Sequence, residues 1–254
     1  MISPRESLRG AVASCLSLSL CLSAFPSCSS ARPAAWHPAT VESWRQLSEE
    51  LSHQRLSRPK ESWSAGLRIT MREPTSGRVI DGRGAIAVEP GQAVRMILTG
   101  AAGATMLDAL VTPTRWRVAV PPLDIVRRGG MAEPRDMPVG FLRWWFLTPL
   151  TGGLFAATFT DAGLLWLLRD SGAVIELRES SCSRGKLLHA TRRMVGRAET
   201  VDECRASATP TVGDSARYFD EMSGLCVDVL LESIASQPPS DDAFRDPDTT
   251  GSGT

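Results

Sequence analysis

Few residues of this chain have the types and spacing that catalysis requires. The sequence has three histidines, His37, His53 and His189, and six cysteines. A catalytic nucleophile needs a neighbouring base, and hydrolase, metalloprotease and nucleotide sites each carry their own spaced motif. The sequence has no GxSxG, HExxH or glycine-rich phosphate motif. We therefore expect a protein that is not an enzyme, with no catalytic residue and no cofactor.

Cys182 and His189 could in principle form a thiol–imidazole pair. They lie seven residues apart in a region whose pattern predicts paired strands. A catalytic cysteine needs a specific base beside it, and this spacing is unspecific. We interpret His189 as an ordinary strand residue. The cysteines also lack a CxxC pair, so the sequence predicts no metal site.

The chemistry that the sequence does indicate is acylation of Cys28. Residues 1–27 read as a signal peptide, with Arg5 and Arg9 ahead of an apolar run that is shorter than the roughly 20 residues of a membrane span. Cys28 follows the small Ser27, as an acylated cysteine follows a bacterial lipoprotein signal. Because Ser29 is not the aspartate that retains lipoproteins at the inner membrane, we expect a palmitate-type anchor in the outer membrane, facing the periplasm. Ordinary signal cleavage and an uncleaved anchor are the alternatives.

Export would place the remaining cysteines in an oxidising compartment. Cys182, Cys204 and Cys226 allow one disulfide and leave one thiol, and the sequence leaves all three pairings open. We favour Cys182 with Cys204, since both flank a stretch that predicts paired strands. The alternative is that all three are small buried hydrophobic residues.

Composition and charge limit the class of protein. The chain has 254 residues, 43% of them hydrophobic, which is enough for one domain with a sizeable core. Its 28 basic residues balance its 28 acidic ones, so it lacks the basic surface that nucleic acid requires. We expect a tether over residues 28–39, a folded domain over 40–235, and a polar, disordered tail over 236–254.

The start of the domain predicts an amphipathic helix that is followed by strands. Thr40 is a candidate N-cap, and apolar residues recur at helical spacing at Val41, Trp44, Leu47 and Leu51. From residue 67 to residue 120 the period changes to about two, with glycine and proline between short apolar runs. This pattern predicts an antiparallel meander with one apolar face and one polar face that carries Arg95, Arg115 and Arg117.

The most hydrophobic part of the domain, residues 137–159, interrupts the strands. A membrane helix is one interpretation, but Arg143 lies inside the segment and Pro149 and Gly152 would break it. We favour a short helix over residues 140–147 that covers the apolar face. Strands resume on both sides of a Ser171-Gly172 turn, and further strands are expected over 186–196 and 225–234.

Three stretches resemble the LolA/LolB superfamily of lipoprotein carriers and receptors. They are "WRQLSEELSHQRL", "VRMILTGAAGATMLDAL" and "MPVGFLRWWFL", and they occur in the family's order. The resemblance implies an α+β fold, in which a curved antiparallel sheet, an incomplete β-barrel, has its apolar concave face covered by a few helices. It also implies that lipid or lipoprotein acyl chains bind in that concavity, with a periplasmic carrier protein as a partner. It places Ala102 at the tip of the loop over residues 100–103.

We expect the concave face to form an apolar cavity. Its predicted lining is Ile86, Val88, Val94, Met96, Leu98, Leu107, Trp116, Val118, Val120, Phe141, Trp144 and Trp145. Burial of an acyl chain there would gain about 0.8 kcal/mol per methylene group. The alternative is a structural envelope lipoprotein whose own side chains fill the same space.

Overall fold

The computed structural model describes residues 40–72, 74, 76–100, 103–133, 137–161 and 163–248. These residues lie in the second of two compact units, Ala35–Thr254. The predicted signal peptide, the tether with Cys28, and Ala102 lie outside the described residues.

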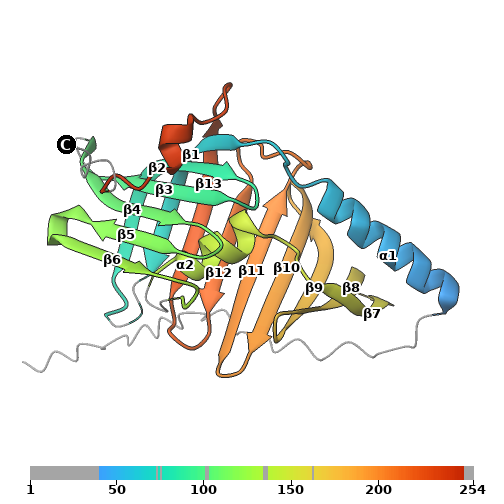
Figure 1. The fold of residues 1–254 in the computed structure, drawn as a ribbon. Coiled ribbons are helices and arrows are strands. Elements are labelled where there is room, and N and C mark those ends of the chain that lie inside the picture. Colours follow the sequence, from blue (N-terminus) through green and yellow to red (C-terminus); the bar gives the residue numbers. More distant parts are fainter. Residues whose placement is uncertain are drawn as a thin grey trace, which may run out of the picture. The chain divides into compact units, whose positions relative to one another are not determined.

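Thirteen strands form one antiparallel sheet (Figure 1). The strands are β1 (Trp63–Arg72), β2 (Val79–Glu89), β3 (Ala93–Thr99), β4 (Thr105–Val111), β5 (Trp116–Val120), β6 (Ile125–Gly129), β7 (Gly153–Thr160), β8 (Gly163–Asp170), β9 (Ala173–Cys182), β10 (Gly185–Met194), β11 (Arg197–Arg205), β12 (Ser215–Asp220) and β13 (Cys226–Ile234). Their order across the sheet is β6-β5-β4-β3-β2-β1-β13-β12-β11-β10-β9-β8-β7. The first and last strands of the chain therefore pair at the centre. The sheet is not closed, because β6 and β7 are its two edges.

Short hairpins connect most strands, as the sequence predicts. Between β8 and β9, Asp170 pairs with Ala173 across a two-residue loop. The two loop residues have positive φ angles, 44° at Ser171 and 85° at Gly172. Such a loop matches the twist of the paired strands, which explains why this position tolerates a left-handed serine.

The helix α1 (Val41–Leu56) lies against β7 and β8 (Figure 1). The Thr40 hydroxyl accepts a hydrogen bond from the Ser43 backbone N–H at 3.2 Å, so the predicted N-cap is confirmed. The predicted apolar face is only partly buried. Leu47 and Leu51 pack into the core, but Trp44 is 37% exposed and Val41 is 80% exposed, because the first turn of the helix does not reach the core.

A second helical segment covers the apolar face of the sheet, as predicted for residues 140–147. It consists of the single turn α2 (Val139–Phe141) and the π-helix η3 (Leu142–Leu147). The segment ends where the Thr148 backbone N–H donates to the carbonyl of Arg143. The strand β7 then starts at Gly153, so the segment over residues 137–159 is not one helix. No helix among the described residues has the length and apolar character needed to cross a bilayer.

Gly140 allows the covering segment to approach the sheet closely. A Cβ atom at this position would lie 2.5 Å from Nη2 of Arg197 and 3.2 Å from the Tyr218 hydroxyl. Any other residue would displace this pair of side chains or lift α2 from the sheet.

Four strands were not predicted from the sequence, namely β6, β7, β11 and β12. Most of β7 lies in the hydrophobic segment over residues 137–159, which was interpreted only in terms of a helix. β6 is an exposed edge strand with little apolar patterning. β11 alternates correctly, but two of its inward-facing residues are glutamates, Glu199 and Glu203, so its inner face does not read as apolar. β12 is only six residues long.

The polar tail also differs from the expectation of disorder, in its described part. Residues Asp241–Phe244 form a 3-10 helix, and the carbonyl of Ala243 accepts a hydrogen bond from Arg95. Asp248 accepts a hydrogen bond from Nε of Arg117 at 2.9 Å. Arg95 and Arg117 also flank Asp108 on the polar face of the sheet, at 2.8 and 3.2 Å. Arg95 and Arg117, two of the three arginines that the sequence placed on the polar face, therefore hold the tail.

Candidate ligand-binding pocket

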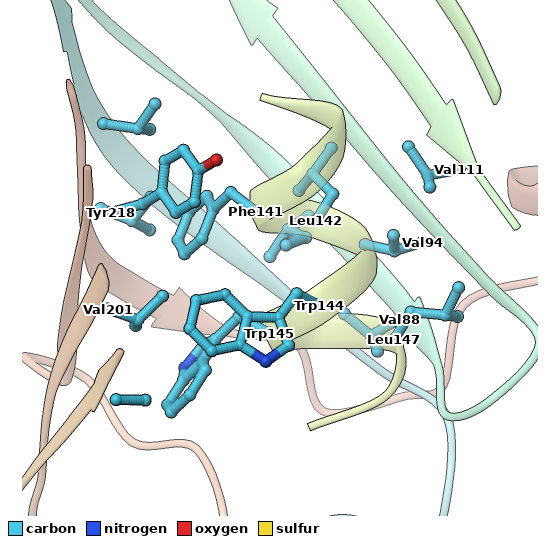
Figure 2. Packing of buried hydrophobic residues seen from close by; sticks show 14 of the residues in the cluster. Val88, Val94, Val111, Phe141, Leu142, Trp144, Trp145, Leu147, Val201 and Tyr218 are labelled. Carbon is cyan, nitrogen blue, oxygen red and sulfur yellow. The ribbon is translucent and has the colours of Figure 1, made fainter. Parts of the chain in front are cut away.

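The structure brings the predicted cavity residues together but leaves no cavity between most of them. Eleven of the twelve belong to one buried, packed hydrophobic cluster. The exception is Val120, which is half-buried at the end of β5. Figure 2 shows why the space is filled: Phe141, Leu142 and the Trp144 and Trp145 indoles lie between Val88 and Val94 on one side and Val201 and Tyr218 on the other. We call this filled region the trough.

An open pocket of about 360 Å³ lies at the end of the trough. Its walls come from the end of α1, the start of β1, the last turn of η3, the start of β12, and the ends of β11 and β13. Its apolar lining includes Trp63, Trp145, Phe146, Val229 and Leu231. Of the twelve predicted residues only Trp145 lines it. Trp63 and Phe146 were not predicted as lining residues, although Phe146 lies in the predicted helix over residues 140–147 and Trp63 is a large apolar residue shortly before the first predicted strand.

An ion pair closes one side of the pocket. The Arg58 guanidinium donates two hydrogen bonds to the Glu203 carboxylate, at 3.0 and 2.7 Å, and also lies 4.9 Å from the centre of the Trp145 ring. Burial lowers the pKa of Arg58, and the facing Glu203 carboxylate offsets part of that effect. Nε of Arg205 lies 3.4 Å from the same carboxylate. Glu203 thus bridges two arginines at the pocket wall.

A second basic side chain holds the loop that follows η3. Arg55 donates to the carbonyl of Leu150 at 2.9 Å and to the carbonyl of Gly152 at 2.6 Å. These contacts fix the pocket edge where the covering segment turns away from the sheet. Both acceptors are neutral, so the positive charge of Arg55 has no carboxylate partner among the described residues.

A buried charged network lies at the opposite side of the trough. Arg197 contacts Glu133, Glu199 and Asp220 at 2.9, 2.9 and 3.3 Å, and the Tyr218 hydroxyl donates to Glu199 at 2.8 Å. Burial raises the pKa of Glu199, and Arg197 lowers it in part. Because Glu133 precedes α2, this network ties the covering segment to β11 and β12.

The residue types that could support catalysis are distributed elsewhere. The structure has a disulfide between Cys182 and Cys204, the pairing that the sequence analysis favours, so Cys182 offers no thiolate to His189. His189 instead lies 2.5 Å from Asp202 and 3.2 Å from the Thr191 hydroxyl. Successive side chains of a strand point to opposite faces of the sheet. Because Ala190 points into the core, His189 and the buried Thr191 on either side of it point the other way. The trio therefore lies on the face of the sheet opposite the pocket. Among the described residues, no group of three or more potential ligands is placed to hold a metal ion.

Solved structures share this architecture at low sequence identity. A protein domain from Vibrio parahaemolyticus named for outer membrane lipoprotein sorting aligns over 79% of this chain and 95% of its own, at 8% identity and a TM-score of 0.50. A LolA superfamily protein from Nitrosomonas europaea aligns over 79% and 97%, at 13% identity and a TM-score of 0.46. A DUF1329 family protein from Desulfovibrio piger aligns over 79% and 96%, at 10% identity and a TM-score of 0.45.

In sequence, no protein-family model and no curated protein matches the chain. The shared architecture is the large, open antiparallel sheet with few helices. This chain therefore shares its fold, the open antiparallel sheet with few helices that its sequence predicts, with the lipoprotein-sorting domain from Vibrio parahaemolyticus.

Proposed function

We propose that this protein binds the acyl chains of lipids or lipoproteins in the cell envelope. The observation that carries the proposal is the half-open, largely apolar pocket at the end of the trough. Its volume of about 360 Å³ falls near the lower end of the roughly 300–1,000 Å³ typical of ligand sites. Each methylene group buried there gains about 0.8 kcal/mol. No catalytic step is needed.

The packed trough limits how much of a chain can enter without rearrangement. An acyl chain that extends beyond the pocket must replace side chains of η3, above all Trp145, which both fills the trough and lines the pocket. Deep binding is therefore coupled to displacement of the covering segment. The pocket is the entry point, and the trough is the space that a longer chain would take.

A fluorescent fatty acid and native mass spectrometry test the proposal. We expect the purified chain to carry lipid and to exchange it for the probe. Ala216→Phe places a large side chain in the pocket and should abolish probe binding, whereas Ala208→Phe, in the exposed loop between β11 and β12, is the matched control. Equal binding by wild type and Ala216→Phe would refute the pocket as the site.

Anchoring through an acylated Cys28 is the second part of the proposal. It places the domain at the outer membrane, on the periplasmic side, where a carrier protein could deliver the cargo. Labelling in a bacterial host with an alkyne fatty acid tests it directly. Label on the wild type that is lost in Cys28→Ala supports the anchor, and label that survives the substitution contradicts it.

The packed trough itself favours a second candidate function. A domain whose concave face is filled by its own tryptophans can serve as a structural accessory of an envelope assembly. This candidate predicts no co-purifying lipid and no binding of a fluorescent fatty acid. The same two measurements therefore separate the candidates.

A further inference from the structure

Two buried N–H groups at the pocket have no acceptor. Trp145 and Arg58 both line the pocket, and neither Nε1 of Trp145 nor Nε of Arg58 has a hydrogen-bond partner among the described residues. Trp145 is only 1% exposed. Buried donors are nearly always paired, by protein or by an ordered ligand or water. Both atoms lie below the pocket surface, so only a ligand that displaces the side chains over them could reach them.

The charges around the pocket are the feature that a ligand can reach directly. Four basic and two acidic side chains line it. Asp214 is already occupied, since it accepts hydrogen bonds from the backbone N–H groups of Ala206 and Thr211. Glu203 is shared between Arg58 and Arg205. The site therefore has more positive charge than its carboxylates neutralise.

Two of the basic residues are available for a ligand. Lys60 is exposed at the pocket and has no ion pair among the described residues. Among the described residues, Arg55 donates to the carbonyls of Leu150 and Gly152, which leave its charge uncompensated. Arg55 lies in the last turn of α1, and Lys60 lies in the short loop that follows and continues into Trp63 on the apolar wall. Cationic and apolar groups therefore lie together at the entrance of the pocket.

We propose that the pocket selects amphiphiles with an anionic oxygen head group, a carboxylate or a phosphate. The head group accepts from Arg55 and Lys60, while the hydrocarbon lies among Trp63, Phe146 and Leu231. This inference rests on the proposed function, because it assumes that the apolar part of the pocket receives the tail.

Calorimetric titration of the full chain carrying Cys28→Ala tests the inference. The probes share one tail length: laurate, dodecyl phosphate and dodecanol, each below its micelle concentration, with inorganic phosphate alone as the fourth. We expect both anionic amphiphiles to bind at least about tenfold more tightly than dodecanol, as charge-assisted hydrogen bonds require. Lys60→Gln should remove part of that advantage and leave dodecanol binding unchanged. Arg193→Gln, an exposed arginine of β10, is the charge-matched control.

The four probes distinguish a failure of this inference from a failure of the proposed function. If all three amphiphiles bind equally, the head-group selection is wrong and acyl binding stands. If no amphiphile binds, the proposed function itself fails. If inorganic phosphate binds as tightly as dodecyl phosphate, the site takes a free anion, and selection of an amphiphile is wrong. A preference for laurate over dodecyl phosphate, or the reverse, identifies which head group the site accepts.

Discussion

The trough and the pocket are two regions of one concave face with opposite outcomes. Both take their walls from the same sheet, and both expose apolar side chains toward its concave side. In the trough, Phe141, Trp144 and Trp145 fill the space above the strands (Figure 2). At the pocket the covering segment has ended at Leu147, so the strands have no such cover. An apolar sheet face therefore forms a core where the covering segment packs on it, and a binding site where the covering segment has ended.

Charge distinguishes the two regions as well. The network around Glu199 is closed: its carboxylate meets Arg192, Arg197 and Tyr218, and it is fully buried. The network around Glu203 borders an open pocket, and the neighbouring Arg55 and Lys60 have no carboxylate partner among the described residues. Closed networks fix the cover in place, whereas the excess positive charge at the pocket leaves a site for a ligand.

The largest expected effect is that of removing the tryptophan shared by both regions. Trp145→Ala should lower the free energy of unfolding by about 3–5 kcal/mol, because a large buried side chain leaves a cavity. The cavity would join the trough to the pocket, so affinity for long acyl chains should rise relative to short ones. Denaturant unfolding and titration with fatty acids of different length measure the two effects. Trp44→Ala, on the exposed side of α1, is the control, and an equal loss in both variants would contradict the comparison.

The second largest effect on stability is expected from the disulfide, because it links β9 to the end of β11 that forms part of the pocket wall. Replacing Cys182 and Cys204 together by serine should lower the free energy of unfolding by about 3 kcal/mol, as the loop between them spans 22 residues. Urea unfolding of the variant, with the wild type under non-reducing conditions as reference, measures this. Replacing the free Cys226 by serine should have a much smaller effect, and a comparable loss would show that the disulfide is not the cause.

A pair of matched substitutions compares the packing of the two regions directly. Ala109→Phe adds a large side chain between Met96 and Val118 in the filled trough, and should destabilise the fold by about 1–3 kcal/mol or more. Ala216→Phe adds the same side chain beside the open pocket, where space exists, and should change stability by less than about 1 kcal/mol. Thermal unfolding of both variants measures the two losses of stability. Similar losses would mean that the pocket does not accommodate added volume.

The smallest expected effect is a pH dependence from the closed network. Burial raises the pKa of Glu199 in the folded state, so its protonated form favours folding. Its stabilising contribution is complete below the unfolded pKa of about 4.3 and is lost as the pH rises through the folded value. The stability of wild type relative to Glu199→Gln should therefore fall as the pH rises from that value. Urea unfolding of both proteins over this range measures it, and a constant difference would contradict the raised pKa.

Local patterns were sufficient to predict most of the fold. Alternation with a period of two predicted β2 to β5 and which of their residues face inward, and Thr40 predicted the start of α1. The turn at Ser171-Gly172 and the covering helix near residues 140–147 were also predicted correctly. Strand β11 was not, because Glu199 and Glu203 face inward, and a sequence does not show that arginines from distant segments neutralise them.

The pocket could not be predicted for a related reason. Its lining combines the stretch after α1, the end of η3 and the starts or ends of several strands. None of these short stretches has a periodic signal of its own. Eleven of the twelve predicted cavity residues lie in the buried cluster, but whether such residues enclose a void depends on the volume of the side chains that pack on them.

The sequence by itself determined an open antiparallel sheet with one apolar face and a short apolar segment to cover it, because side-chain periodicity is a local property of the chain. Only the tertiary structure decided that Trp144 and Trp145 fill most of that face and that a pocket remains beyond Leu147. Packing depends on the volumes of side chains that are distant in sequence, and no local pattern records how those volumes add up.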